Sequence, residues 1–290
     1  QQERKLSAHE LREILLSQIT GIEINEEAVH VAAFSLYLAL LQHQEPKSIL
    51  AQIEKTTGEK PLPYLIYDSN SNNDSSVLFH GNAFSLMSSE REYIQDKLIN
   101  NPRFAGRIEF ARLSDSEESL PLTAHSFDVV IGNPPYVHLE KIKETSIALK
   151  NANYETYHSQ GDIYCVFVEK GIDLLKPKGL ISYIMPNKWL QAGYGKPLRE
   201  YFLKYKMFEL IDFGDIQIFD GATTYPCIFT SQKAKPEKEI SISVLKESNS
   251  MDFKFNVLET AKIFETNSFS GETWVISSQK EQAFLEKLKT

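Results

Sequence analysis

A short apolar run near the middle of the chain ends abruptly in an asparagine and two prolines. Residues 127–132 read FDVVIG and are followed directly by Asn133, Pro134, Pro135 and Tyr136. A β-branched run that stops at glycine and proline is typical of a buried strand. The next four residues are therefore expected at the carboxyl end of that strand, where open α/β sheets place their ligands. An amide, a carbonyl and an aromatic face there suit a planar base with an exocyclic amino group.

The net charge, the apolar stretches, the cysteines and the histidines limit the classes of partner and site that the chain can have. The 290 residues carry a formal net charge of −8, which argues against gripping nucleic acid mainly through phosphate neutralisation. No apolar stretch approaches the ~20 residues that span a bilayer, so we expect no membrane partner. Cys165 and Cys227 make no disulfide framework and are expected as reduced thiols in a cytoplasmic protein. The seven histidines show no metal-ligand spacing.

The order of the predicted elements indicates an α/β fold. Strands and helices alternate along most of the chain, which predicts a mostly parallel sheet with helices on both faces. The polar segment 137–160 is expected to be a mobile loop over the site. Strands are predicted near residues 19–24, 77–82, 127–132, 180–186, 207–213 and 225–231, and helices near 4–18, 26–41, 87–99, 162–175 and 196–206.

Two polar residues follow predicted strands, and each leaves a choice open. Glu23 closes a strand before a helix, where doubly wound folds bind ribose hydroxyls with a carboxylate. An acid at that position also serves as a helix cap, and both interpretations stand. Asn82 ends the next strand, where side chains can reach an adenine ring edge, and its position alone does not settle that role.

Three aromatic residues are candidates for a base pocket. Phe219 lies in a loop between strands and would either cover a core edge or offer a second stacking face opposite Tyr136. Phe167, on the helix after Asp162, is more typical of a core residue. Trp189 follows another strand end and fits either a structural wedge or a pocket wall.

Taken in order, these segments resemble a known enzyme family. An acid-ended strand, a Gly-Asn strand end, FDVVIGNPPYV, GDIYCVFVEKGIDLLKPKG, LISYIMPNKWL and IFDGATTYPCIF occur in that sequence. The run is similar to the catalytic domain of S-adenosylmethionine-dependent adenine-N6 DNA methyltransferases, of the kind fused in restriction-modification or phage-defence polypeptides. The resemblance covers roughly residues 10–235. It implies a Rossmann-like methyltransferase sheet with helices on both faces. It also implies that the protein acts on DNA, at an adenine target.

The resemblance assigns residues to the cofactor and to the reaction. It implies that Glu23 binds the ribose hydroxyls of S-adenosylmethionine and that Asn82 contacts its adenine amine. The catalytic motif is residues 133–136, in which the Asn133 side-chain oxygen and the Pro134 carbonyl accept hydrogen bonds from the target amino group. Pro135 completes the motif.

The same resemblance implies a pocket for an adenine turned out of the duplex, because its amine is unreachable inside the helix. Tyr136 and Phe219 would sandwich that base. The Phe167 position also lines the base pocket in this family, which favours a contact role over a purely structural one. No metal is expected.

The chain departs from the family at its beginning. The glycine-rich cofactor loop should lie upstream of Glu23, yet residues 1–20 contain no glycine. The first strand, central in the family's sheet, is expected to be missing, and unpaired inner edges are unfavourable. We therefore expect an excised piece of a larger protein that binds cofactor weakly or not at all. Residues 1–235 would be a partial catalytic core, and 236–290 a small extension connecting to an absent target-recognition domain.

Two alternatives remain beside adenine methylation. Protein-glutamine methyltransferases share the Asn-Pro-Pro-Tyr motif, and cytosine-N4 enzymes carry a related one. A non-catalytic scaffold or binding relic of the fold is the other, since cofactor machinery is incomplete while Glu23, Asn133 and Tyr136 are present.

Overall fold

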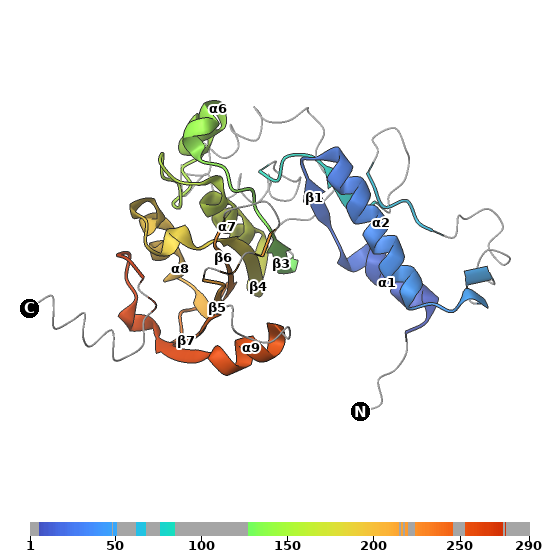
Figure 1. The fold of residues 1–290 in the computed structure, drawn as a ribbon. Helices are drawn as coiled ribbons and strands as arrows, with labels where there is room; N and C mark the ends of the chain where they lie inside the picture. Colours follow the sequence, from blue (N-terminus) through green and yellow to red (C-terminus); the bar gives the residue numbers. More distant parts are fainter. Residues whose placement is uncertain are drawn as a thin grey trace, which may run out of the picture. The chain divides into compact units, whose positions relative to one another are not determined.

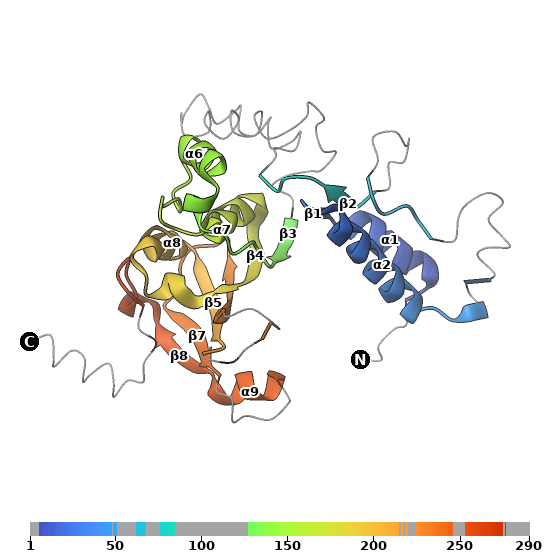
Figure 2. The ribbon, with the colours of Figure 1, turned by 45° about the horizontal axis from the view of Figure 1, so that its top comes forward.

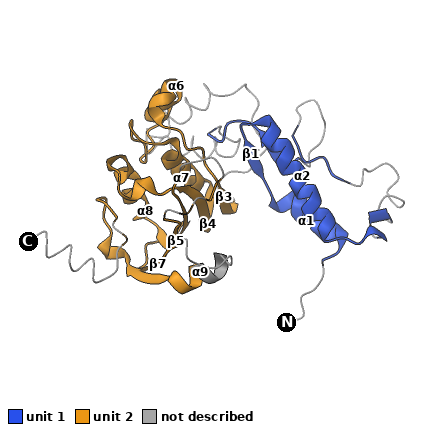
Figure 3. Cartoon of the chain, viewed as in Figure 1, with its two compact units in different colours: residues 1–86, 111–120 blue, residues 87–110, 121–290 orange. Residues whose placement is uncertain are grey.

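The computed structural model describes residues 6–47, 49–50, 62–67, 76–84, 127–214, 216, 218–219, 224–245, 253–274 and 276. The chain divides into two compact units (Figure 3). Unit 1 comprises residues 1–86 and 111–120, and unit 2 comprises residues 87–110 and 121–290. Each unit is described by itself below. The helix expected over residues 87–99 lies outside the described residues.

Unit 1 pairs two helices with a two-stranded parallel sheet (Figure 1). Its elements in chain order are α1 (Ala8–Gln18), β1 (Gly21–Glu23), α2 (Glu26–Gln42) and β2 (Leu78–His80). In the register of β1 and β2, Glu23 lies opposite His80. The carboxyl ends of both strands therefore share one edge of this sheet.

Local hydrogen bonds explain where the helices of unit 1 begin. Ser7 and Glu10 form a capping box at the start of α1, with each side chain bonded to the other residue's backbone N–H. The Asn25 side chain accepts a hydrogen bond from the Ala28 N–H at 3.0 Å and so caps α2. Apolar residues of α1, α2 and β2 pack into one core, which includes Leu15, Val29 and Leu78. Both strands and both helices expected here are confirmed, within a few residues at their ends.

Unit 2 is built around a six-stranded sheet of order β3-β4-β6-β5-β7-β8 (Figure 2). Helices lie on both sides of it, as the sequence predicted. The strands are β3 (Phe127–Gly132), β4 (Leu175–Pro186), β5 (Lys206–Asp212), β6 (Pro226–Gln232), β7 (Glu239–Val244) and β8 (Lys262–Glu265). The α-helices are α6 (Lys143–Asn151), α7 (Ile163–Leu174), α8 (Lys196–Phe202) and α9 (Phe253–Thr260). The 3-10 turns are η1 (Leu139–Lys141), η2 (Asn187–Leu190), η3 (Gly193–Gly195) and η4 (Thr266–Ser268).

The sheet of unit 2 is mixed, and the expectation of a mostly parallel sheet was wrong in this respect. β3 pairs with β4 and β5 pairs with β7 in parallel, whereas β6 runs antiparallel to both β4 and β5. The insertion of β6 between β4 and β5 comes from long-range pairing. Alternation of elements along the sequence does not reveal it.

β3 is less buried than its apolar sequence predicts. Val129 is 55% exposed and Ile131 is 76% exposed. Among the described residues β3 has β4 as its only strand partner, and β1 likewise has only β2. One edge of each strand therefore has no strand partner in the described part of the chain. The prediction that the family's first strand is missing stays a prediction.

The segment 137–160 is more ordered than the loop expected from its polar composition. It holds η1 and α6, and Leu149 and Ala152 are fully buried. Thr156 is also buried, and its N–H and hydroxyl both donate to the Glu169 carboxylate on α7, at 2.9 and 3.1 Å. These contacts tie the segment to the helix behind it, so the prediction of a mobile loop is corrected.

Trp189 lies at the centre of an aromatic cluster in the core of unit 2. Its side chain is fully buried, and its ring centroid lies 5.2 Å from Phe202, 5.8 Å from Phe229 and 5.4 Å from Trp274. Of the two roles left open for Trp189, the structural wedge is the one observed. Helix α7 packs over β4 and β3 above this core. The cluster thus joins η2 to α8, to β6 and to the segment around Trp274.

Two further expectations concern the chain as a whole. β7 and β8 follow residue 235 and extend the sheet of unit 2, while the predicted division into catalytic core and connector at that residue stays a prediction. Within the described residues, no helix is both long and apolar enough to cross a membrane.

Candidate active site

The motif of residues 133–136 directly follows β3, as its sequence predicted. Asn133 and Pro135 are exposed, Pro134 is buried and Tyr136 is half-buried. Within the described part of the chain, neither the Asn133 carboxamide nor the Pro134 carbonyl has a hydrogen-bond partner. Two acceptors without a partner in the described part of the chain therefore follow each other in sequence at the carboxyl end of a strand.

Tyr136 is held against the core of unit 2 by its ring rather than by its hydroxyl. Its ring meets Tyr164 edge to face, with centroids 6.4 Å apart and planes at 85°. Its hydroxyl donates to the Ile184 carbonyl on β4 over a long 3.4 Å. Burial first, and the neighbouring Cys227 second, raise the pKa of Tyr136 to about 12. The phenol is therefore neutral at ordinary pH and offers an aromatic surface, not a base.

The other two predicted pocket residues also belong to unit 2. Phe167 lies on α7 and packs, partly buried, against the hydrophobic core. Phe219 lies in the connection between β5 and β6 and is partly buried. Residues 217 and 220–223 beside it lie outside the described residues. The base-contact roles of Phe167 and Phe219 stay predictions.

Glu23 stands exposed at the carboxyl end of β1. Its Oε1 accepts a hydrogen bond from the Asn25 N–H at 2.9 Å, so it does help to shape the start of α2. Its Oε2 has no hydrogen-bond partner among the described residues. A carboxylate with a free oxygen at a strand end retains acceptors for a pair of sugar hydroxyls.

Asn82 lies near the same end of β2. Its Oδ1 accepts a hydrogen bond from the Phe84 N–H at 3.0 Å, which forms the local turn. The carbonyl oxygen has a second lone pair, and no partner is described for the side-chain NH₂ group. Gly81 N–H donates to the Glu23 carbonyl at 2.9 Å, which joins the two strand ends within unit 1.

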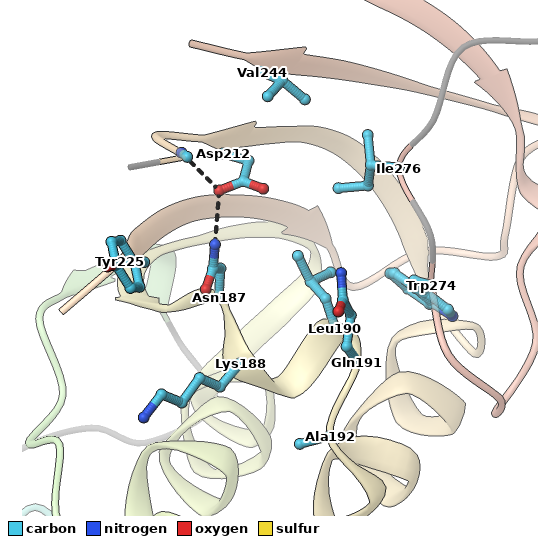
Figure 4. A pocket seen from close by; sticks show the side chains of 11 residues that line it. Asn187, Lys188, Leu190, Gln191, Ala192, Asp212, Tyr225, Val244, Trp274 and Ile276 are labelled. Carbon is cyan, nitrogen blue, oxygen red and sulfur yellow. Dashed lines mark hydrogen bonds between the residues drawn. The ribbon is translucent and has the colours of Figure 1, made fainter. Parts of the chain in front are cut away.

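A pocket of about 490 Å³ opens at the carboxyl ends of β4, β5 and β7 in unit 2, at a place that no predicted site residue occupies. Figure 4 shows the Asn187 side chain donating to Asp212, at 3.0 Å, while the Gly214 N–H donates to the same carboxylate oxygen. Strand-end polar residues in PNKWL and LIDFG were the available signal. The lining residues are Asn187, Lys188, Leu190, Gln191, Ala192, Asp212, Gly214, Tyr225, Val244, Trp274 and Ile276.

The two cysteine thiols of unit 2 are not suited to nucleophilic catalysis. Cys165 and Cys227 are free and buried, and burial raises the pKa of both thiols well above the ordinary value. Neither thiol is a nucleophile at neutral pH. Within the described residues, no three His, Cys, Asp or Glu side chains gather in a way that suits a metal ion.

Comparisons with known proteins find relatives of one kind. The family model for the Eco57I restriction-modification methylase matches residues 17–219. The type II restriction enzyme and methyltransferase RM.Eco57I of Escherichia coli is 28% identical over 280 residues, which is 95% of this chain and 24% of that protein. The type II methyltransferase M.XhoI of Xanthomonas vasicola is 34% identical over 40% of this chain and 21% of its own length.

More distant matches agree with these. The adenine-specific methyltransferase PglX of Lacticaseibacillus casei is 22% identical over 77% of this chain and 20% of its own length. The ATP-dependent type ISP restriction-modification enzyme LlaBIII, solved bound to DNA, shares the fold with a TM-score of 0.51 at 13% identity. That match covers 96% of this chain and 19% of that one.

The extent of these matches decides what they establish. The chain spans about a fifth to a quarter of the length of RM.Eco57I, M.XhoI and PglX. The family model, in contrast, covers well over half of this chain, including both unit 1 strands and the motif after β3. The chain therefore belongs to the Eco57I restriction-modification methylase family.

Proposed function

We propose that the chain is the catalytic part of a DNA methyltransferase that methylates the N6 amino group of adenine, with S-adenosylmethionine as methyl donor. One observation carries the proposal. Asn133 and Pro134 offer two oxygen acceptors that have no hydrogen-bond partner among the described residues, next in sequence to the neutral ring of Tyr136 and at the carboxyl end of β3. Membership of a methylase family supports the same reaction class.

The two acceptors suit an exocyclic amino group. The nitrogen of adenine N6 is a poor nucleophile because its lone pair is delocalised into the ring. The Asn133 oxygen and the Pro134 carbonyl would each accept one of its two hydrogens and favour a more tetrahedral nitrogen. Fixed acceptors of this kind stabilise the charge that develops on the nitrogen and align it for in-line displacement.

The neutral state of Tyr136 fits this mechanism. Since burial keeps its phenol protonated, Tyr136 contributes a stacking surface rather than a base. We propose that the target adenine, turned out of the duplex, lies between Tyr136 and Phe219, with Phe167 at the edge of the pocket. The amino proton leaves after the methyl group arrives, so no strong base is required.

The residues proposed to hold the cofactor fit it in part. The free Oε2 of Glu23 suits the ribose hydroxyls, and the spare lone pair of Asn82 Oδ1 suits an adenine amine. When bound, S-adenosylmethionine supplies an electrophilic methyl group on a sulfonium. Glu23 and Asn82 would hold the ribose and the adenine of the cofactor and take no part in proton transfer.

DNA affinity is proposed to come largely from other parts of the natural polypeptide. The net charge of −8 gives this chain little general attraction for phosphates. The relatives are about two to four times as long as this chain, which leaves room for a target-recognition module.

The test is methyl transfer from tritiated S-adenosylmethionine, with the natural polypeptide that carries this chain and with the chain alone. Mixed DNA and a protein extract serve as acceptors, and an Asn133→Ala variant serves as the control. Label in DNA that depends on Asn133 supports the proposal. Label in protein would favour the glutamine alternative, and no label from either protein would favour the scaffold.

A further inference from the structure

A buried carboxylate lies behind the candidate base pocket. Asp162 directly precedes α7 and is only 6% exposed. An aspartate in this position usually caps the helix, yet the Asp162 side chain makes no capping hydrogen bond. It turns instead toward Tyr194 and His138, which lie on other segments. The cost of burying this carboxylate is therefore not explained by helix capping.

The contacts of Asp162 form a directed chain of hydrogen bonds. The Tyr194 hydroxyl donates to Asp162 Oδ2 at 3.1 Å, and His138 Nδ1 lies 3.0 Å from Oδ1. The Tyr164 and Tyr194 hydroxyls are 3.0 Å apart. Because the single proton of Tyr194 is given to Asp162, Tyr164 must be the donor in that pair. Asp162 thus sets the direction of both phenol groups.

This chain ends on the ring of Tyr136. Tyr164 is fully buried and meets Tyr136 edge to face, at 6.4 Å and 85°. Rotation or retreat of the Tyr164 ring would remove the surface against which Tyr136 rests. Aromatic pairs of this geometry attract each other beyond the effect of their buried area.

Backbone hydrogen bonds make a second connection between the segment after Tyr136 and the segment before Tyr164. The Ile163 N–H donates to the Val137 carbonyl at 3.0 Å, and the Leu139 N–H donates to the Gly161 carbonyl at 2.9 Å. His138 and Asp162 form an antiparallel bridge between them. The residues directly after Tyr136 are therefore paired with the residues directly before Tyr164.

We propose that Asp162, acting through Tyr194 and Tyr164, is a positioning residue that fixes the ring of Tyr136 at the angle needed to stack on the target base. The inference rests on the proposed function, since it names what orients a residue of that site. Asp162 touches neither base nor cofactor. Its effect reaches the reaction only through the orientation of Tyr136.

The decisive variant is Tyr194→Phe, which keeps the ring and cuts the hydrogen-bond chain. Tyr205→Phe is a matched control, because it also removes one tyrosine-to-tyrosine hydroxyl contact, 3.4 Å from Tyr201, in the same unit. Asp162→Asn is the second test variant, and thermal melts check that all three proteins fold.

The first readout reports on structure alone. With 3-fluorotyrosine placed at position 136, the fluorine resonance of the natural polypeptide should shift or broaden in Tyr194→Phe and in Asp162→Asn. It should stay unchanged in Tyr205→Phe. An unchanged resonance in both test variants would overturn the inference.

The second readout is steady-state methylation of DNA by the unlabelled proteins. Tyr194→Phe should lower kcat on the order of tenfold and leave the KM for S-adenosylmethionine unchanged, because misplaced reacting groups slow the chemical step. The double variant Tyr194→Phe with Asp162→Asn should lose no more kcat than the less active of the two single variants, as expected for residues of one network. Equal kcat in Tyr194→Phe and Tyr205→Phe would contradict the inference. A wild type that methylates no DNA would contradict the proposed function, and the fluorine comparison would still decide the positioning.

Discussion

Substitutions at Tyr136 separate stacking from proton transfer. Tyr136→Phe keeps the ring and removes a hydroxyl whose only described bond, to Ile184, is 3.4 Å long. Such a bond is weaker than the usual net ~0.5–1.5 kcal/mol, so we expect the rate to change by about twofold or less. Tyr136→Ala removes the stacking face. Base stacking on an aromatic is worth roughly 1–3 kcal/mol, which corresponds to a loss of roughly 5- to 150-fold in kcat/KM.

The assay is kcat/KM for DNA methylation by the natural polypeptide, measured from pH 7 to 10 for wild type and both variants. A 2-aminopurine placed at the target position reports base turning and stacking by its fluorescence, which should change in Tyr136→Ala only. Since burial raises the pKa of Tyr136 to about 12, wild type and Tyr136→Phe should share one pH profile over this range. The loss of a pH-dependent step in Tyr136→Phe, or equal damage in both variants, would refute the stacking role.

Three further predictions address the acceptors, the cofactor and stability. Asn133→Ala should lower kcat on the order of 10²-fold with little effect on cofactor KM, whereas Asn133→Asp retains an acceptor and should keep more activity; equal losses would contradict the acceptor role. Glu23→Gln should weaken S-adenosylmethionine binding by the natural polypeptide on the order of tenfold by calorimetry, and the control Glu26→Gln, in the exposed first turn of α2, should not. The raised pKa values of Cys165 and Cys227 mean that the folded chain retains protons that the unfolded chain releases near the ordinary pKa of 9.0. The free energy of unfolding should therefore fall as pH rises above about 9, by up to about 1.4 kcal/mol per pH unit for each thiol, and urea midpoints at pH 7 and pH 10 that agree would contradict this.

Local signals predicted the elements that depend on neighbouring residues. Asn25 caps α2 as its sequence indicates, and residues 133–136 follow β3 directly. The glycine and prolines that follow the apolar run end that strand, and this local signal is readable within a few residues of sequence. The Glu23 carboxylate proved to have the local role that an acid before a helix suggests, while one oxygen stays available for its proposed role.

Features that depend on distant contacts were not predictable in the same way. The place of β6 between β4 and β5 is set by pairing across the sheet. The order in segment 137–160 comes from Thr156 meeting Glu169, two polar residues that composition alone assigns to solvent. Val129 and Ile131 share one face of β3, and periodicity does not show that this face is exposed.

The candidate site likewise has features that local sequence predicts and features that depend on distant contacts. The sequence placed residues 133–136, Glu23 and Asn82 at or near strand ends because strand ends are local properties, and the roles of these residues stay predictions. The network from Asp162 through Tyr194 to Tyr164 joins residues 30 positions apart, and only the fold brings them together. Strand-end residues such as Asn187 and Asp212 were visible in the sequence, but the pocket they share was not.

The central claim is that adenine N6 is the methylated atom. The most direct measurement is mass spectrometry of nucleosides from the DNA of cells that lack adenine methylation and express the natural polypeptide that carries this chain. The account predicts N6-methyladenine that disappears with Asn133→Ala. N4-methylcytosine in its place, or N6-methyladenine that persists in Asn133→Ala, would contradict it.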